Sequence, residues 1–106
     1  MSGQYQPEPP RQTLETLRGP AVIDFGTNWC GYCQAAAPLI EAALAGRKRV
    51  RHIKVEDGPG RPLGRAYRVK LWPTLVFLRD GVEVARVVRP TDVAEIVRAL
   101  DRIGAD

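Results

Sequence analysis

Cysteine and histidine, the residues that most often build disulfide frameworks and metal sites, are scarce in this sequence. Among 106 residues there are two cysteines, Cys30 and Cys33, and one histidine, His52. Structural disulfides usually join distant segments, whereas a bond between these two cysteines would close only a tiny loop. A structural zinc site needs about four ligands, more than these three side chains supply. We therefore expect neither a disulfide scaffold nor a metal site.

Long hydrophobic runs are also absent. The richest apolar stretch, residues 35–45, is interrupted by Pro38 and Glu41. It is shorter than the roughly 20 apolar residues that span a bilayer. Residues 1–10 contain no apolar stretch typical of a secretory signal. We therefore expect a cytoplasmic protein that does not associate with a membrane.

Positive charge is in only modest excess. The net charge is +4, and thirteen of the sixteen positive residues are arginine. The densest cluster, residues 47–51, has no interleaved aromatic side chains on which bases could stack. A solvated basic surface explains this charge, and we expect no nucleic-acid partner.

The length and the apolar content of 44% fit one globular domain. Residues 1–10 contain three prolines and few apolar side chains. The sequence therefore predicts a flexible N-terminal tail over residues 1–10 and one domain over residues 11–106. We expect this domain to be a monomer.

The order of apolar segments predicts an α/β fold. Segments rich in apolar and β-branched residues predict strands at residues 21–25, 50–55, 74–78 and 82–88. Helices are predicted at residues 11–18, 30–46 and 62–67, and a closing helix from Thr91 or Asp92 onward. Asp80-Gly81, between the last two strands, is typical of a β-hairpin. Strands that alternate with helices before a hairpin predict a mixed sheet with helices on both faces.

The two cysteines stand where a buried strand is followed by a helix, in the sequence Cys30-Gly31-Tyr32-Cys33. At a helix N-terminus, unpaired N–H groups and the helix dipole stabilise a thiolate over a thiol. The thiolate is the form that attacks a disulfide, and helical spacing places Cys33 beside Cys30 to resolve the mixed disulfide. We expect Cys30 to be the exposed attacking cysteine and Cys33 to lie one turn deeper.

Several motifs follow one another along the chain in a characteristic order. The first are a buried strand at residues 22–25, the loop at residues 28–33, and Ala37-Pro38 inside the following helix. Further on come Trp72-Pro73-Thr74 before an apolar strand and the Asp80-Gly81 hairpin. In this order and at these separations the motifs resemble the thioredoxin family. The resemblance implies a thioredoxin fold with a mixed sheet of four to five strands.

The resemblance also implies the role of each site residue. Cys30 would be the nucleophile, Cys33 the resolving thiol, and Asp24 a buried proton acceptor with Lys54 beside it. Burial within an apolar strand disfavours a charged carboxylate, so Asp24 could exchange protons near neutrality. The residues implied to contact the substrate are Trp29, Gly31, Tyr32, Trp72, Pro73 and Thr74, with a cis peptide bond before Pro73.

The implied activity is thiol–disulfide exchange with protein substrates, most simply as a reductant. The dithiol itself carries the redox equivalents, so no bound cofactor is expected. A partner reductase, which the sequence does not identify, would have to restore the electrons.

The chain departs from the family pattern at four site positions. Gly26 stands where an aromatic residue is frequent, so part of the floor of the active site is expected to be missing. Tyr32 stands where thioredoxins carry proline, Trp72 where a smaller aliphatic residue is usual, and Arg89 near a loop where glycine is normal. The family's first strand is barely visible near residues 3–7.

Two alternative functions follow from these departures. The pair Gly31-Tyr32 is also found in periplasmic disulfide isomerases, so an oxidase or isomerase is one alternative. Trp72 and Arg89 suggest another, a binding module in which redox turnover is incidental. Trp29 either contacts the substrate or packs on the rim of the site, and Trp72 either contacts the substrate or fills a gap. His52 lies within a strand pattern and is interpreted as a structural histidine.

Overall fold

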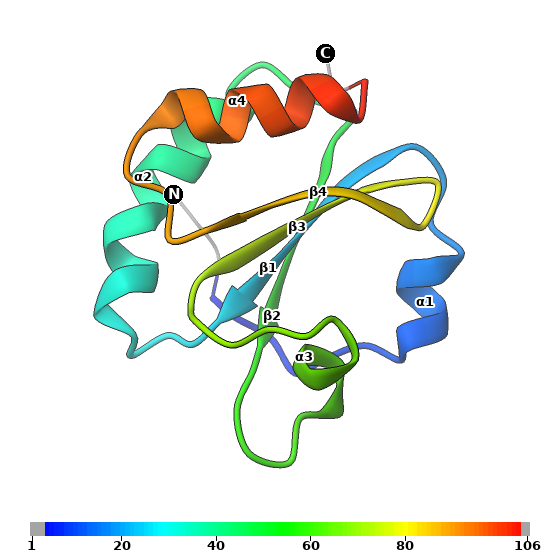
Figure 1. Cartoon of the computed structure of the whole chain (residues 1–106), viewed down its shortest axis with the longest axis vertical. Coiled ribbons are helices and arrows are strands. Elements are labelled where there is room, and N and C mark those ends of the chain that lie inside the picture. The colour runs from blue at the N-terminus through cyan, green and yellow to red at the C-terminus, as the bar shows by residue number, and fades with distance from the viewer. Residues whose placement is uncertain (1–3, 105–106) are drawn as a thin grey trace.

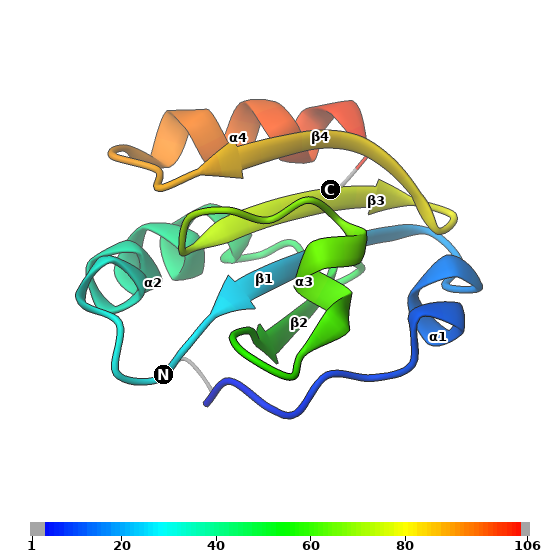
Figure 2. The same cartoon turned by 60° about the horizontal axis from the view of Figure 1, so that its bottom comes forward.

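The computed structural model describes residues 4–104, in which helices and strands alternate up to a final pair of consecutive strands and a closing helix (Figure 1). In chain order they are α1 (Arg11–Glu15), β1 (Pro20–Gly26), α2 (Gly31–Leu44), β2 (Arg51–Glu56), α3 (Pro62–Ala66), β3 (Thr74–Arg79), β4 (Val82–Val88) and α4 (Val93–Arg102). The four strands form one sheet in the order β2-β1-β3-β4, which Figure 2 shows side by side. β1 runs parallel to β2 and antiparallel to β3, and β3 and β4 form the predicted hairpin. The predicted mixed α/β sheet is confirmed.

Helices cover both faces of the sheet, as the sequence predicts. The cluster on one face contains residues from α2 and α4 together with Val22, Leu75 and Phe77 of the strands. The cluster on the other face contains Leu14 of α1 and Leu63 of α3. Every residue of β1 is buried because this strand lies between two others and is covered on both faces. β1 therefore provides a rigid base for the residues that follow it.

α2 and α4 begin in different ways. Cys30 is the N-cap residue of α2, and the helix continues through Pro38. At α4 the Asp92 side chain accepts a hydrogen bond from the Glu95 amide, and the Glu95 side chain accepts one from the Asp92 amide. This capping box satisfies N–H groups that would otherwise have no partner at the start of α4.

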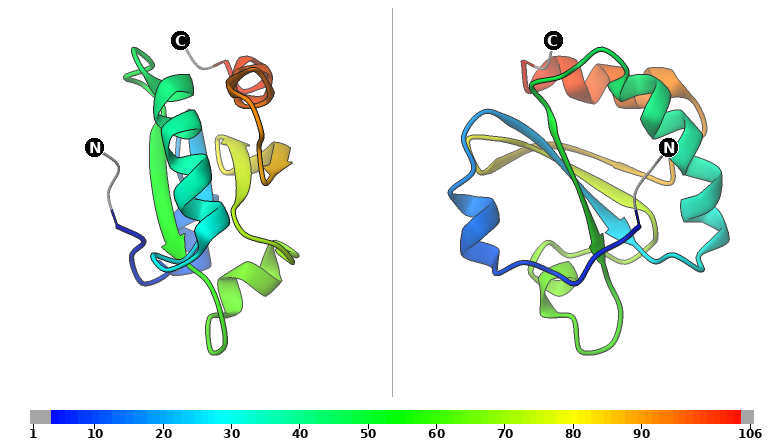
Figure 3. Two further views of the ribbon diagram at one scale, coloured as in Figure 1. Left: turned by 90° about the vertical axis from the view of Figure 1, so that its left-hand side faces the viewer. Right: turned by 180° about the vertical axis from the view of Figure 1, so that it is seen from behind.

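The N-terminal segment packs on the domain, which differs from the expected flexible tail. The backbone of Gln6 pairs with β2 in a parallel bridge to Val55, beside the end of that strand (Figure 3). Tyr5 is buried. This short pairing is the only trace of an additional strand within residues 4–104. Residues 1–3 of the predicted tail lie outside the described residues.

None of the helices within residues 4–104 is both long and apolar enough to cross a bilayer.

Candidate active site

The two cysteines lie at the junction between β1 and α2. Cys30 has an extended backbone conformation, and its Sγ accepts a hydrogen bond from the Cys33 amide with an N···S distance of 3.3 Å. The first amides of a helix lack intrahelical partners, so they are available to a sulfur at the N-cap. This contact favours negative charge on Cys30, as expected for an attacking thiolate.

Both cysteines are buried, which corrects the expectation of an exposed Cys30. Cys30 is 7% exposed and Cys33 is 3% exposed. Together with Tyr5 they form a small cluster against which Trp72 packs. Cys30 is still the more accessible of the two cysteines, as expected. The difference in exposure is small because neighbouring side chains cover Cys30.

Asp24 is held by the side chains of Tyr5 and His52. It is 1% exposed. The Tyr5 hydroxyl lies 2.7 Å from its Oδ1, and Nε2 of His52 lies 3.1 Å from its Oδ2. An ionised carboxylate only accepts hydrogen bonds, so both partners must donate to it. These contacts compensate part of the cost of burying the charge.

Tyr5 fills the space that Gly26 leaves. A Cβ at Gly26 would lie 2.8 Å from the Tyr5 hydroxyl oxygen and 2.5 Å from the Cys33 sulfur. The prediction of a missing floor is therefore wrong for this site, because a tyrosine from the N-terminal segment occupies the gap. The Lys54 ammonium lies 4.4 Å from the centroid of the same ring. Lys54 also pairs directly with Asp24 in the register of β1 and β2.

The surroundings shift the acidity of Cys33 and Tyr5. Burial raises the pKa of the Cys33 thiol, and its hydrogen bond with Cys30 raises it further. Hydrogen bonding to the Thr27 backbone and to Tyr5 lowers the same pKa. Burial and the adjacent Asp24 charge raise the pKa of Tyr5 well above its ordinary value. Cys33 therefore needs a proton acceptor before it can act as a nucleophile.

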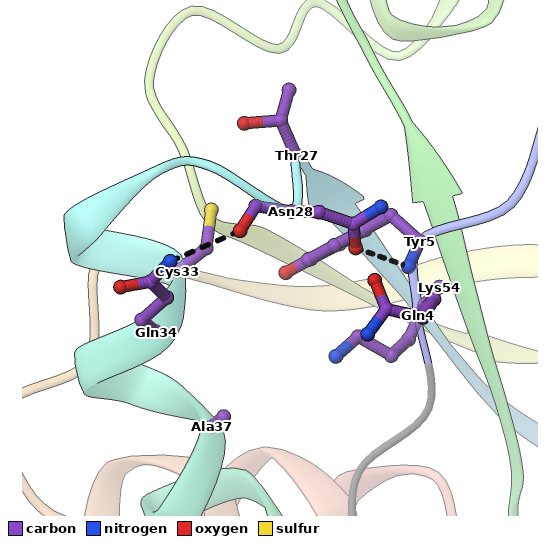
Figure 4. A pocket seen from close by; sticks show the side chains of 8 residues that line it. All are labelled: Gln4, Tyr5, Thr27, Asn28, Cys33, Gln34, Ala37 and Lys54. Atoms are coloured by element: carbon purple, nitrogen blue, oxygen red, sulfur yellow. Dashed lines mark hydrogen bonds between the residues drawn. The ribbon is translucent and has the colours of Figure 1, made fainter.

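A small cavity opens beside Cys33 (Figure 4). Its volume is about 230 Å³, and it is lined by Gln4, Tyr5, Thr27, Asn28, Cys33, Gln34, Ala37 and Lys54. Asn28 orders this wall, because its side chain accepts a hydrogen bond from the Tyr5 amide and its carbonyl accepts one from the Gln34 side chain. In Figure 4 the Tyr5 side chain reaches from the N-terminal segment toward the helix that carries Cys33.

The loop before β3 has the predicted cis peptide bond, between Trp72 and Pro73. Thr74 is buried, and its hydroxyl donates to the Leu71 carbonyl over 2.6 Å. The Thr74 side chain therefore has an internal partner and does not face outward, although the sequence assigned it to substrate contact.

Arg89 has a left-handed backbone conformation, which glycine adopts most readily. Its φ is +49°, which is unfavourable for a side chain with a Cβ. Several contacts hold it there: its amide donates to the Pro73 carbonyl, its Nε donates to the Trp72 carbonyl, and its guanidinium lies 3.7 Å from the centroid of the Tyr32 ring. Arg89 thus joins the loop before β3 to the start of α2.

Aromatic side chains form the rim of the site. Trp29 is 73% exposed and Tyr32 is 59% exposed. Trp29 contacts Trp72 edge to face, and the indole N–H of Trp72 donates to Asp57 over 2.9 Å. Gly31, between the cysteines, has open space where a Cβ would be. Of the sequence-predicted residues, Trp29, Gly31 and Tyr32 lie next to the cysteines in the chain, and Trp72 packs against the cluster that the cysteines form with Tyr5.

Sequence reasoning missed Tyr5 and His52 as neighbours of Asp24. His52 could have been found, because His52 and Lys54 are two residues apart and so lie on the same face of β2. Tyr5 carried no such signal, since it lies in a proline-rich segment without periodicity. Within residues 4–104, no group of three or more His, Cys, Asp or Glu side chains is placed to hold a metal ion.

The arrangement has the parts that thiol–disulfide exchange requires. A helix-capping cysteine can attack, a second cysteine one turn away can resolve the mixed disulfide, and a buried carboxylate is bonded to Tyr5, which packs against both cysteines.

Comparisons with known proteins agree with this geometry. A thioredoxin from Chlamydia trachomatis is 35% identical over 85 residues, which cover 79% of this chain and 82% of that protein. Thioredoxin Asp f 28 from Aspergillus fumigatus is 31% identical over 90 residues, covering 85% of this chain and 83% of that protein. The solved structure of reduced thioredoxin 2 from Pseudomonas aeruginosa superposes with a TM-score of 0.86 at 52% identity, covering 98% of each chain. Because the thioredoxin family model also matches residues 6–102, this chain belongs to the thioredoxin family.

Proposed function

We propose that the protein is a thiol–disulfide oxidoreductase that reduces disulfides of other proteins through Cys30 and Cys33. The observation that carries this proposal is the position of Cys30 as the N-cap of α2, with the Cys33 amide directed at its sulfur. Membership of the thioredoxin family supports the same activity.

In the first step the Cys30 thiolate attacks one sulfur of a target disulfide. A bond forms between Cys30 Sγ and that sulfur, the target disulfide breaks, and the other target sulfur leaves with the electron pair. The amide of Cys33 stabilises the attacking thiolate. The product is a mixed disulfide between Cys30 and the target.

In the second step Cys33 releases the target. Cys33 loses its proton with the help of Asp24, and its thiolate then attacks Cys30 Sγ. The bond between Cys33 and Cys30 forms as the bond between Cys30 and the target breaks. The target leaves fully reduced, and the two electrons have come from the dithiol.

We assign contact with the target to the rim of the site. Trp29, Gly31 and Tyr32 flank Cys30, and exposed aromatic side chains are common anchors at protein interfaces. Trp72 packs against the dithiol from the loop before β3, and Pro73 follows it through the cis peptide bond. The contribution of Thr74 would come from its backbone, because its hydroxyl is bonded to Leu71.

The cellular setting that fits this function is a reducing one. We propose a cytoplasmic monomer that transfers electrons from a partner reductase to protein disulfides. The dithiol would be reduced again after each turnover, so no bound cofactor is needed.

The reductant is favoured over the two alternatives. Gly31-Tyr32 alone suggests an oxidase or isomerase, whereas the Chlamydia trachomatis relative and the Pseudomonas aeruginosa structure are thioredoxins. The redox potential of the Cys30/Cys33 pair, measured by equilibration with glutathione mixtures, distinguishes a reductant from an oxidase or isomerase. A strongly reducing potential excludes the oxidant, and each 30 mV corresponds to about 1.4 kcal/mol. If the protein were instead a binding module, a variant with alanine at both Cys30 and Cys33 would keep its cellular effect.

The function is tested with two matched cysteine variants in an insulin-reduction assay. Cys30→Ser should abolish reduction, because no attacking thiolate remains. Cys33→Ser should also stop turnover but should accumulate a mixed disulfide with the target, visible by mass spectrometry under non-reducing conditions. Full reductase activity in Cys30→Ser would contradict the mechanism.

A further inference from the structure

We propose that the Tyr5 hydroxyl relays a proton from Cys33 to Asp24, which makes Tyr5 a catalytic residue in the release of the target. The proposal rests on the proposed function, since it concerns how Cys33 becomes a thiolate in the second step. Tyr5 lies one residue before the part of the chain that the thioredoxin family model matches.

The Tyr5 hydroxyl lies close to both groups. The Tyr5 oxygen lies 2.7 Å from Asp24 Oδ1. The same oxygen and the Cys33 sulfur both lie within 3 Å of the position that a Cβ at Gly26 would occupy. The absence of a side chain at Gly26 therefore lets a phenol enter the space between the thiol and the carboxylate.

The direction of the hydrogen bonds fits a relay. The Asp24 carboxylate can only accept, so the Tyr5 hydroxyl proton points toward Oδ1. The lone pairs of the Tyr5 oxygen then remain free to accept a proton from the Cys33 thiol, which lies against the same Gly26 position. The result is a proton-transfer path that runs from the Cys33 S–H through the Tyr5 O–H to Asp24.

Transfer along this chain conserves every hydrogen bond. The Cys33 proton passes to the Tyr5 oxygen as the Tyr5 proton passes to Asp24 Oδ1. Afterwards Tyr5 donates to the Cys33 thiolate and Asp24 donates to Tyr5, so both bonds are reversed and neither is lost. The new thiolate attacks Cys30 Sγ, and the electron pair of the broken disulfide leaves with the target sulfur.

The surroundings keep the relay in place and tyrosine neutral. Burial and the Asp24 charge raise the pKa of Tyr5, so the two protons move together and no free phenolate forms. His52 donates to the other oxygen of Asp24 and holds the carboxylate toward Tyr5. The Lys54 ammonium lies over the Tyr5 ring and holds it by a cation–π contact.

The test separates the two chemical steps with reduced protein in excess over dithiobis(nitrobenzoate). This disulfide releases one coloured thiolate when Cys30 attacks and a second when Cys33 resolves the mixed disulfide. Stopped-flow absorbance therefore gives a first phase that depends on protein concentration and a second that does not. Tyr5→Phe keeps the ring that fills the gap and removes only the hydroxyl.

We expect Tyr5→Phe to slow the second phase by at least about tenfold, because general acid–base catalysis contributes about 10²–10⁴-fold, and to leave the first phase within about twofold. Tyr67→Phe is the matched control, because Tyr67 contacts Phe25 on the other face of the sheet. It should leave both phases unchanged. Thermal melting of each variant shows that the comparison is made on folded protein.

Asp24→Asn provides an independent arm that does not alter Tyr5. Tyr5 and Asp24 act in one proton-transfer path. The Tyr5→Phe/Asp24→Asn double variant should therefore be no slower in the second phase than the slower of the two single variants. The relay is refuted by a second phase that stays within twofold of the original in Tyr5→Phe, by equal slowing of both phases, or by multiplicative effects of the two substitutions. A starting protein that releases only one thiolate would instead refute the proposed function itself.

Discussion

At the scale of single residues, the site depends on a glycine that makes room for a tyrosine. Gly26 leaves open the space into which the Tyr5 ring fits, between Asp24 and Cys33. The identity of residue 26 was visible in the sequence, but its consequence was not. The side chain that fills the gap comes from a segment 21 residues earlier in the numbering, and only packing brings the two together.

Gly26→Ala is predicted to destabilise the protein and to displace Tyr5. The new Cβ would lie 2.5 Å from the Cys33 sulfur and 2.8 Å from the Tyr5 hydroxyl. Overpacking of this kind costs about 1–3 kcal/mol of unfolding free energy, which urea denaturation would measure. Gly31→Ala is the matched control, because nothing lies within 4 Å of its Cβ position. Its stability should change by no more than about 0.5 kcal/mol. Equal stabilities for the two variants would contradict the described packing.

At the scale of the elements, the residues that cap the helices supply hydrogen-bond partners to the first amides of α2 and α4. Cys30 caps α2 with its sulfur, whereas α4 begins with the Asp92 and Glu95 capping box. The sequence predicted a helix start at Thr91 or Asp92, and the structure selects Asp92 because its side chain reaches the Glu95 amide. Helix-capping motifs of this kind can be predicted from the sequence because all the residues that form them lie within a few positions of one another.

Asp92→Ala is predicted to weaken α4. Without the side-chain acceptor, the Glu95 amide at the start of the helix loses its partner. The expected loss is about 1 kcal/mol of unfolding free energy. Asp92→Ser, which keeps a capping oxygen, should retain most of the stability. Urea denaturation of both variants measures the difference, and an Asp92→Ala protein as stable as the original would show that the capping box contributes nothing.

At the scale of the whole molecule, burial of the dithiol couples folding stability to pH. The pKa of Cys33 is raised in the folded protein by burial and by Cys30. An unfolded chain releases this proton near pH 8.5, the ordinary value for a thiol. Below about pH 8.5 both states hold the proton, and above it only the folded state does. Stability is therefore full below this pH and falls as the pH rises toward the raised folded value.

The reduced protein is thus predicted to lose stability above about pH 8.5, by up to about 1.4 kcal/mol for each pH unit. Cys33→Ala lacks this proton, so its stability should fall less over the same range. The other titratable groups around position 33, Cys30, Tyr5 and Lys54, are the same in both proteins, so the difference between the two curves isolates Cys33. Urea denaturation at several pH values under reducing conditions provides the comparison. Parallel curves would contradict the shifted ionisation.

The sequence by itself determined the elements, their order and the identity of the dithiol. Apolar periodicity, the Asp80-Gly81 turn and the spacing of Cys30 and Cys33 act between near neighbours, so they can be recognised without coordinates. Only the tertiary structure decided that Tyr5 and His52 hold Asp24, that Arg89 reaches Tyr32, and that Cys30 is covered. These contacts join distant segments, and they depend on strand register and on which side chain fills each space.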